Sequence, residues 1–114
     1  MEIRTGLSYG DALLVPQRSA VDSRSDIDLT ARLTPSLTLD TPIVSAAMDT
    51  VTEAETAAAL ADLGGLGVIH RFLSIGEQAA EVREVAEQGG PVAAAVGIDE
   101  DYLDRTEAIL NAGG

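Results

Sequence analysis

The sequence predicts an α/β protein built on a parallel sheet, and three observations support this fold class. From residue 42 onward, an apolar stretch followed by a helical stretch occurs three times. The apolar stretches contain almost no polar residues, which is typical of strands in a parallel sheet that is covered on both faces. Clusters of glycine and proline separate each strand–helix pair from the next one.

Residues 1–41 form a separate region, which we predict to be an irregular lead-in. Residues 21–29 are polar, and the dipeptides Thr34-Pro35 and Thr41-Pro42 interrupt any regular pattern. Only residues 37–39 alternate in the way that a short strand would. We therefore divide the chain into a lead-in at 1–41 and a strand–helix region at 42–114.

The first strand–helix pair is predicted as a strand at 42–46 and a helix at about 52–63. Thr50 and Glu53 have the spacing of a capping box, in which each side chain bonds the backbone amide of the other residue. The Gly64-Gly65 dipeptide then ends the helix, because glycine adopts the left-handed conformation that often follows a last helical turn.

The second pair is predicted as a strand at 66–70 and a helix at about 75–88. Ser74 and Glu77 supply a second capping box at the start of this helix. Its apolar residues recur at helical spacing and fall on one face. These are Ala79, Val82, Val85 and Ala86.

The third pair is predicted as a strand at 92–98 and a helix at about 100–111, with Asp99 as the N-cap. Four residues of this helix share one face and are expected to face the core. These are Leu103, Thr106, Ile109 and Leu110.

The chain is strongly acidic: its 114 residues include 19 Asp and Glu against 7 basic residues, all of them Arg, for a net charge of −12. This charge repels the phosphates of nucleic acids and anionic lipids, so we expect no nucleic-acid and no membrane partner. No apolar run approaches the roughly 20 residues that span a bilayer, and the N-terminus lacks a secretory pattern. We expect a cytoplasmic protein, and the Lys-free acidic composition suggests a halophilic source.

The sequence contains no Cys and a single His. These counts exclude disulfides, thiol nucleophiles, thiolate metal sites and multi-histidine zinc sites from this chain. We also find no dinucleotide fingerprint, because Gly64, Gly65 and Gly67 precede a strand, whereas a Rossmann glycine loop follows one. We interpret these glycines as helix termination and close helix–strand packing.

The candidate functional residues lie where the first two predicted strands end, because α/β proteins bind ligands at the carboxyl ends of parallel strands. They are Ser45, Ala46, Met48, Asp49, Thr50 and His70. Structural alternatives stay open for several of them. Met48 could fill a gap in the core, Ser45 could bond a backbone group, and Asp49 could complement a helix dipole. A lone His at a strand end is structural as often as it is functional.

Four phrases of the sequence resemble, in order, the inosine monophosphate dehydrogenase and GMP reductase family. They are Gly-Leu-Ser-Tyr-Gly-Asp-Ala-Leu-Leu-Val-Pro at residues 6–16, Ser-Ala-Ala-Met-Asp-Thr-Val-Thr-Glu at 45–53, Gly-Gly-Leu-Gly-Val-Ile-His at 64–70 and Ser-Ile-Gly-Glu-Gln-Ala-Ala-Glu-Val-Arg at 74–83. The resemblance covers nearly the whole chain and is strongest from Gly6 to Val85.

The resemblance implies a (β/α)8 TIM barrel, of which this chain would supply the N-terminal portion. Residues 1–41 would be the lead-in, and residues 42–114 the first three βα units. A complete barrel needs about 250 residues, so we expect the chain to be part of a longer protein and to be inactive alone. Full-length members of the family are usually homo-oligomers, most often tetramers.

The resemblance also implies nicotinamide-dependent chemistry on a purine nucleoside monophosphate. The dehydrogenase converts IMP, NAD and water to XMP and NADH through a loop cysteine, with a monovalent cation such as potassium ordering that loop. The reductase uses NADPH to convert GMP to IMP and ammonia. The loop cysteine, the phosphate-binding loops and the cation site belong to later strands in this family, so no catalytic residue and no metal site is expected in this chain.

Within the chain, the resemblance assigns substrate-binding roles only at the end of the first strand. Ala46 and Met48 match positions that line the purine nucleotide, and Ser45 belongs to the same motif. Asp49, Thr50 and His70 are expected as contacts around the edge of the site.

Some features separate the two activities of the family. Dehydrogenases usually carry paired CBS modules between the second helix and the third strand, but here residues 88–91 join the two directly. Residues 23–29 resemble the reductase lead-in, whereas residues 45–53 and 64–70 resemble the dehydrogenase. Phe72 stands where dehydrogenases commonly carry Asn. The resemblance favours an IMP dehydrogenase, with GMP reductase as the alternative and a non-catalytic small α/β binding module as a third interpretation.

Overall fold

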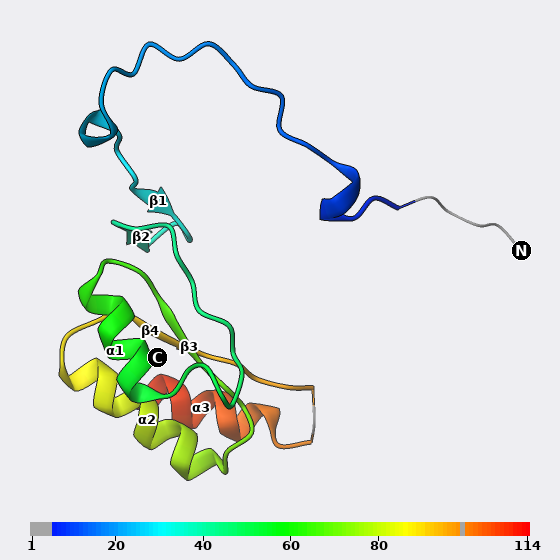
Figure 1. Ribbon diagram of the computed structural model, residues 1–114. Helices are drawn as coiled ribbons and strands as arrows, with labels where there is room; N and C mark the ends of the chain where they lie inside the picture. The colour runs from blue at the N-terminus through cyan, green and yellow to red at the C-terminus, as the bar shows by residue number, and fades with distance from the viewer. Residues whose placement is uncertain (1–5, 99) are drawn as a thin grey trace, which may run out of the picture.

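The computed structural model describes residues 6–98 and 100–114. Its first part, up to about residue 30, runs as an extended chain away from the helices (Figure 1). Two short 3-10 turns interrupt this lead-in, η1 at Tyr9–Asp11 and η2 at Arg24–Asp26, and neither contains a buried residue. The radius of gyration is 18.0 Å, against about 13 Å for a compact domain of this length. The lead-in therefore contributes little to the core.

A short hairpin follows the lead-in. The strand β1 (Ala31–Arg32) pairs antiparallel with β2 (Thr38–Leu39), with Ala31 opposite Leu39. This confirms a strand within the predicted 37–39 segment. Leu39 is buried, while Thr38 is exposed, so the alternation in the sequence reflects one buried and one solvated face.

The parallel sheet is shorter at every strand than the sequence predicts. The predicted 42–46 strand makes a single parallel bridge, Val44 to Leu66. Next to it lie β3 (Gly67–Ile69) and β4 (Val92–Ala94), which pair in parallel with Gly67 opposite Val92. Within the described ranges, the 42–46 segment and β4 each have a neighbour on one side only, so part of their predicted length lacks hydrogen-bond partners.

The helix α1 (Ala54–Asp62) begins two residues later than predicted, and the predicted Thr50–Glu53 capping box does not form. Glu53 is the N-cap, but its side chain makes no capping hydrogen bond. The Thr52 hydroxyl instead donates to the carbonyl oxygen of Ala46, at 2.7 Å. The prediction was wrong because the chain from 46 to 53 closes on itself before the helix starts.

The helix α2 (Ile75–Glu87) carries the predicted capping box. The Ser74 hydroxyl oxygen accepts from the Glu77 amide, and the Glu77 carboxylate accepts from the Ser74 amide at 2.9 Å. Both partners lie within one helical turn, so the sequence alone was sufficient to predict this feature.

The helix α3 (Tyr102–Ala112) starts two residues after the predicted position, and its N-cap is Asp101, without a side-chain capping bond. The predicted N-cap, Asp99, lies outside the described residues. Leu103 and Leu110 are 65% and 63% exposed, so the predicted core face of this helix was wrong for both. Ile109 and Ala112 are the residues of α3 that are buried.

The core lies between the sheet and one layer of helices. Its buried residues come from α1, α2, α3, β3 and β4. They are Ala54, Ala57, Ile69, Ala79, Val82, Val85, Val92, Ile109 and Ala112. α2 packs against both α1 and α3, so the three helices share one face of the sheet. The expected cover on both faces is therefore wrong for the described residues, and Val44 remains 46% exposed.

This one-sided arrangement has a simple cause. The parallel strands are adjacent in the order in which they occur along the chain. Right-handed crossovers between consecutive neighbouring strands place every connecting helix on the same side. The longest helix, α2, has 13 residues, and no helix in the described ranges has both the length and the hydropathy needed to cross a bilayer.

Candidate functional site

The candidate site is the loop at residues 46–53, which joins the first strand segment to α1 at the carboxyl edge of the sheet (Figure 1). The carbonyl of Ala46 accepts from the Met48 amide at 2.9 Å and from the Thr52 hydroxyl at 2.7 Å. The carbonyl of Met48 accepts from the amides of Val51 and Thr52, both at 3.0 Å. These bonds fold the 46–53 loop into a compact turn with a fully buried Thr52.

Ser45 ties the first strand segment to β3. Its amide donates to the Leu66 carbonyl at 3.0 Å, and its hydroxyl oxygen accepts from the Val68 amide at 2.9 Å. The hydroxyl thus replaces a ladder hydrogen bond at the point where regular pairing ends. Ser45 therefore bonds a backbone group, as the structural alternative predicts. The hydroxyl oxygen is the acceptor in this bond, so the hydroxyl proton can still be donated.

Met48 is displayed on the surface of the 46–53 loop. Its side chain is 51% exposed, and Ala46 is also exposed. A methionine that filled a gap in the core would be buried, so the core interpretation of Met48 does not hold in this structure. The thioether is available to an apolar or aromatic ligand surface.

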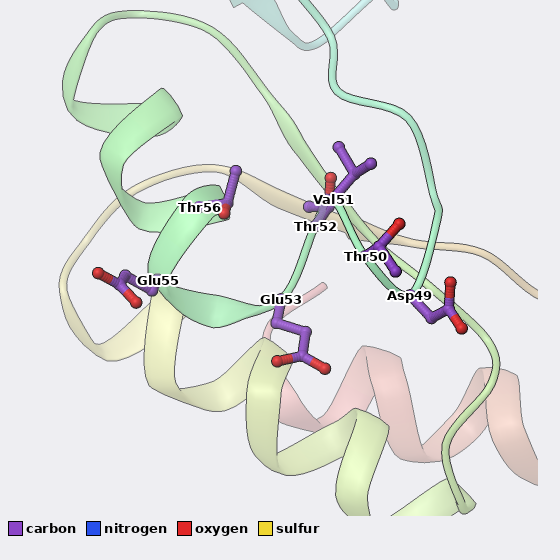
Figure 2. Close-up of a pocket in the computed structure, with 7 residues that line it drawn as sticks. All are labelled: Asp49, Thr50, Val51, Thr52, Glu53, Glu55 and Thr56. Carbon is purple, nitrogen blue, oxygen red and sulfur yellow. The ribbon is translucent and has the colours of Figure 1, made fainter.

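Asp49 and Thr50 are exposed and line a polar hollow of about 190 Å³. Figure 2 shows the seven lining side chains around the start of α1. They are Asp49, Thr50, Val51, Thr52, Glu53, Glu55 and Thr56. The amides at a helix N-terminus favour an anion, but three carboxylates border this hollow and oppose one. The hollow is therefore unsuited to a phosphate or pyrophosphate group.

His70 lies at the end of β3 and is buried, with 2% of its surface exposed. Its Nδ1 accepts from the Phe72 amide at 3.1 Å, and its Nε2 lies 3.3 Å from Glu53 Oε1. Because Nδ1 acts as an acceptor, the hydrogen-bond network assigns the ring proton to Nε2, which donates to Glu53. Both nitrogens are engaged, so direct contact between this imidazole and a ligand requires one of these bonds to break.

A buried polar network behind the strand ends was not predicted from the sequence. The Gln78 side chain donates to the carbonyls of His70 and Ala95, at 3.0 and 2.9 Å, and its oxygen accepts from Arg105 at 2.9 Å. Arg105 also donates to the Leu73 carbonyl and to Asp101. The network ties α2 and α3 to the ends of β3 and β4, and no local pattern in the sequence identifies it.

A second unpredicted contact joins α2 to the start of α1. The carboxylate of Glu81 accepts from the amide of Ala54 at 2.5 Å, across 27 positions of sequence. Glu81 is partly buried.

In the described parts of the chain, no group of three or more His, Cys, Asp or Glu side chains is arranged to hold a metal ion.

These observations define an α/β protein in which adjacent parallel strands carry a surface loop at their carboxyl edge. Residues 6–114 match the family model of the IMP dehydrogenase / GMP reductase domain. The chain therefore belongs to the IMP dehydrogenase / GMP reductase family.

Relatives in both branches of the family are similar to the chain. It is 53% identical over 89 residues to an inosine-5'-monophosphate dehydrogenase of Nitrosopumilus maritimus, covering 78% of this chain and 19% of the relative. It is 54% identical over 84 residues to the Aquifex aeolicus inosine-5'-monophosphate dehydrogenase, covering 74% and 17%. A Leishmania donovani GMP reductase is 51% identical over 80 residues, covering 70% and 16%. The chain thus matches less than a fifth of the length of each of these relatives.

Proposed function

We propose that this chain is the N-terminal part of an IMP dehydrogenase-like oxidoreductase, which converts IMP, NAD and water to XMP and NADH. Residues 1–41 are the lead-in and residues 42–114 the first three βα units of a (β/α)8 barrel. The observation that carries the proposal is the 46–53 loop, which displays Met48 at the carboxyl edge of adjacent parallel strands. Enzymes with this barrel place their active sites at that edge.

The one-sided helical layer supports the barrel part of the proposal. A barrel needs strands that neighbour each other in chain order and helices on the outer side only. The strand order and the packing of α1 on α2 and of α2 on α3 meet both conditions. A doubly wound sheet would place helices on both faces.

The roles we propose for the residues follow from their chemistry. The exposed Met48 thioether packs against the purine ring, and the small, exposed Ala46 lets the ring approach the backbone. Ser45 supports them from the strand, and its hydroxyl proton can bond a polar group of the nucleotide. Asp49 and Thr50 offer polar contacts around the hollow, and His70 acts through its bond to Glu53.

The polar hollow at the start of α1 does not fit the nicotinamide dinucleotide. Its pyrophosphate needs amide and cationic donors, whereas the hollow beside Met48 is bordered by Asp49, Glu53 and Glu55. The sequence holds no Cys, so we place the cysteine nucleophile of this chemistry outside these 114 residues.

GMP reductase is the second candidate, because a GMP reductase of Leishmania donovani is 51% identical to this chain over 80 residues. That activity would use NADPH and convert GMP to IMP and ammonia. In either case we propose a cytoplasmic homo-oligomer, with a tetramer as the expected form, from a halophilic source.

The test uses the full-length protein in high salt. One reaction contains IMP and NAD, the other GMP and NADPH, and the near-ultraviolet absorbance of the reduced nicotinamide is followed. A rise with IMP supports the dehydrogenase, and a fall with GMP supports the reductase. If the folded protein changes the absorbance in neither reaction, the proposed function is overturned.

A further inference from the structure

At the first turn of α1, the capping hydrogen bond is accepted by a residue of another helix, α2. The first amides of a helix have no partner within the helix, and the N-cap side chain usually supplies one. Here the N-cap side chain of Glu53 is directed to His70 and makes no capping bond. The amide of Ala54, the first residue of α1, donates instead to the Glu81 carboxylate of α2.

This cap is also the downstream anchor of the 46–53 loop. Ala54 directly follows the loop, and the Thr52 hydroxyl, two positions earlier, holds the Ala46 carbonyl at 2.7 Å. The Thr52 amide holds the Met48 carbonyl at 3.0 Å. The contacts therefore run without a gap from Glu81, through the backbone at Ala54, to the two residues proposed to face the purine.

The hydrogen bond that the Ala54 amide donates to Glu81 is a strong one, because its acceptor is a carboxylate and its surroundings are partly buried. The other tie to the start of α1 is the 3.3 Å contact between Glu53 and His70, in which Glu53 is 56% exposed. Glu81 is thus the better-shielded of the two anchors on the 46–53 loop.

We propose that Glu81 is a positioning residue for nucleotide binding: it fixes the start of α1 and thereby the orientation of Ala46 and Met48. The proposal rests on the proposed function. Glu81 acts behind the loop and does not itself contact the nucleotide. A small displacement of a binding group by a remote change can lower activity by up to about 100-fold, so the expected effect is measurable.

The first experiment measures amide hydrogen exchange in the full-length protein. In Glu81→Ala we expect exchange at residues 47–54 to accelerate about tenfold, the factor given by losing one hydrogen bond. In Glu81→Gln, whose amide oxygen can still accept, we expect a smaller increase. Glu84→Ala, an exposed carboxylate on the same helix, should leave exchange in the loop unchanged. Glu77→Ala removes the carboxylate half of the capping box of α2, which accepts from the Ser74 amide, and should affect residues 74–78.

The second experiment measures nucleotide kinetics on the same variants. We expect Glu81→Ala to raise the KM for the purine nucleotide at least about fivefold with little change in kcat, and Glu81→Gln to restore most of the affinity. A purely structural role predicts lower thermal stability at unchanged KM, as expected for Glu77→Ala.

The two experiments separate the two proposals. If the wild-type protein neither binds nor converts IMP or GMP, the proposed function is overturned. The hydrogen-exchange measurement would still decide whether Glu81 anchors the loop. Unchanged exchange at 47–54 in both Glu81 variants would refute the positioning role. The positioning role would also be refuted if the wild-type protein is active and the Glu81→Ala and Glu84→Ala variants have the same KM.

Discussion

Gly67 of β3 lies directly against Ala57 of α1, so closely that a Cβ on the glycine would come well within 3.0 Å of the alanine side chain. Ala57 is completely buried. Because Ala57 belongs to a helix and Gly67 to a strand, neither backbone can shift without disturbing its own element. The contact sets the distance between α1 and the sheet, and therefore the place where the 46–53 loop enters its helix.

Gly67→Ala should consequently destabilise the protein by about 2–3 kcal/mol, the usual cost of overpacking a tight core. Gly76→Ala is the matched control, because a Cβ there meets nothing within 4 Å and alanine is the better helix former in α2. That control should be neutral or stabilising by up to about 1 kcal/mol. Urea unfolding measures both, and equal stabilities for the two variants would contradict the proposed contact.

Gln78 joins α2 and α3 to the ends of β3 and β4. Gln78→Ala would leave the carbonyls of His70 and Ala95 and an N–H of Arg105 without their partner. We expect a loss of about 2–3 kcal/mol, because a buried unpaired group costs about 1–3 kcal/mol and the bonds to Ala95 and Arg105 are partly buried. Gln88→Ala, at an exposed glutamine, should change stability by less than about 0.5 kcal/mol. Thermal unfolding of both variants provides the measurement.

Glu77 should make stability depend on pH in the acidic range. Hydrogen bonds from the Ser74 hydroxyl and then the Ser74 amide lower the pKa of the Glu77 carboxyl below its ordinary value of 4.5. A pKa lowered by folding means that the unfolded state binds protons first, so this contribution is fully present above the unfolded pKa. It is lost as the pH falls through the folded pKa.

The measurement is the urea midpoint as the pH is lowered through 4.5. Ser74→Ala removes the largest cause of the lowered pKa and should flatten the acid-side loss of stability. Glu77→Gln should flatten it as well. The double variant should not add the two effects, because both changes remove the same pair. A slope unchanged from wild type in either single variant would count against this source of pH dependence.

Met48 should affect binding without affecting stability. Its side chain is half exposed, so Met48→Ala should cost less than about 0.5 kcal/mol of stability. The same change should raise the KM for the nucleotide about tenfold, equivalent to about 1.4 kcal/mol of lost contact. Leu63→Ala, at a 72% exposed position at the opposite end of α1, should change neither property. A KM for Met48→Ala equal to that of the wild type would remove Met48 from the proposed site.

Local features were predictable where both partners lie within one helical turn. The Ser74–Glu77 capping box formed as predicted, and Gly64 follows α1 with a left-handed φ of 80°. The interpretation of Gly67 as a close-packing residue was also confirmed. The first two features depend on backbone chemistry that the neighbouring residues already fix, whereas the partner of Gly67 is Ala57 of α1.

The errors occurred where a distant residue changes the local balance. Thr50 and Glu53 have capping-box spacing, but Thr52 closes the loop on Ala46 and Glu53 is directed to His70 instead. The apolar pattern on α3 included Leu103 and Leu110, although Arg105 occupies the position that faces Gln78. Periodicity identifies an apolar stripe but does not indicate which part of the stripe a neighbouring helix covers.

The sequence by itself determined the three strand–helix pairs, the glycine stops, the candidate residues at the end of the first strand and the family. These follow from patterns of a few consecutive residues, which act through short-range sterics and hydrogen bonds. Only the tertiary structure decided that all three helices share one face, that Met48 is displayed while His70 is buried, and that Glu81 caps α1. Those outcomes join groups many positions apart, and their energies exist only once the chain has brought the groups together.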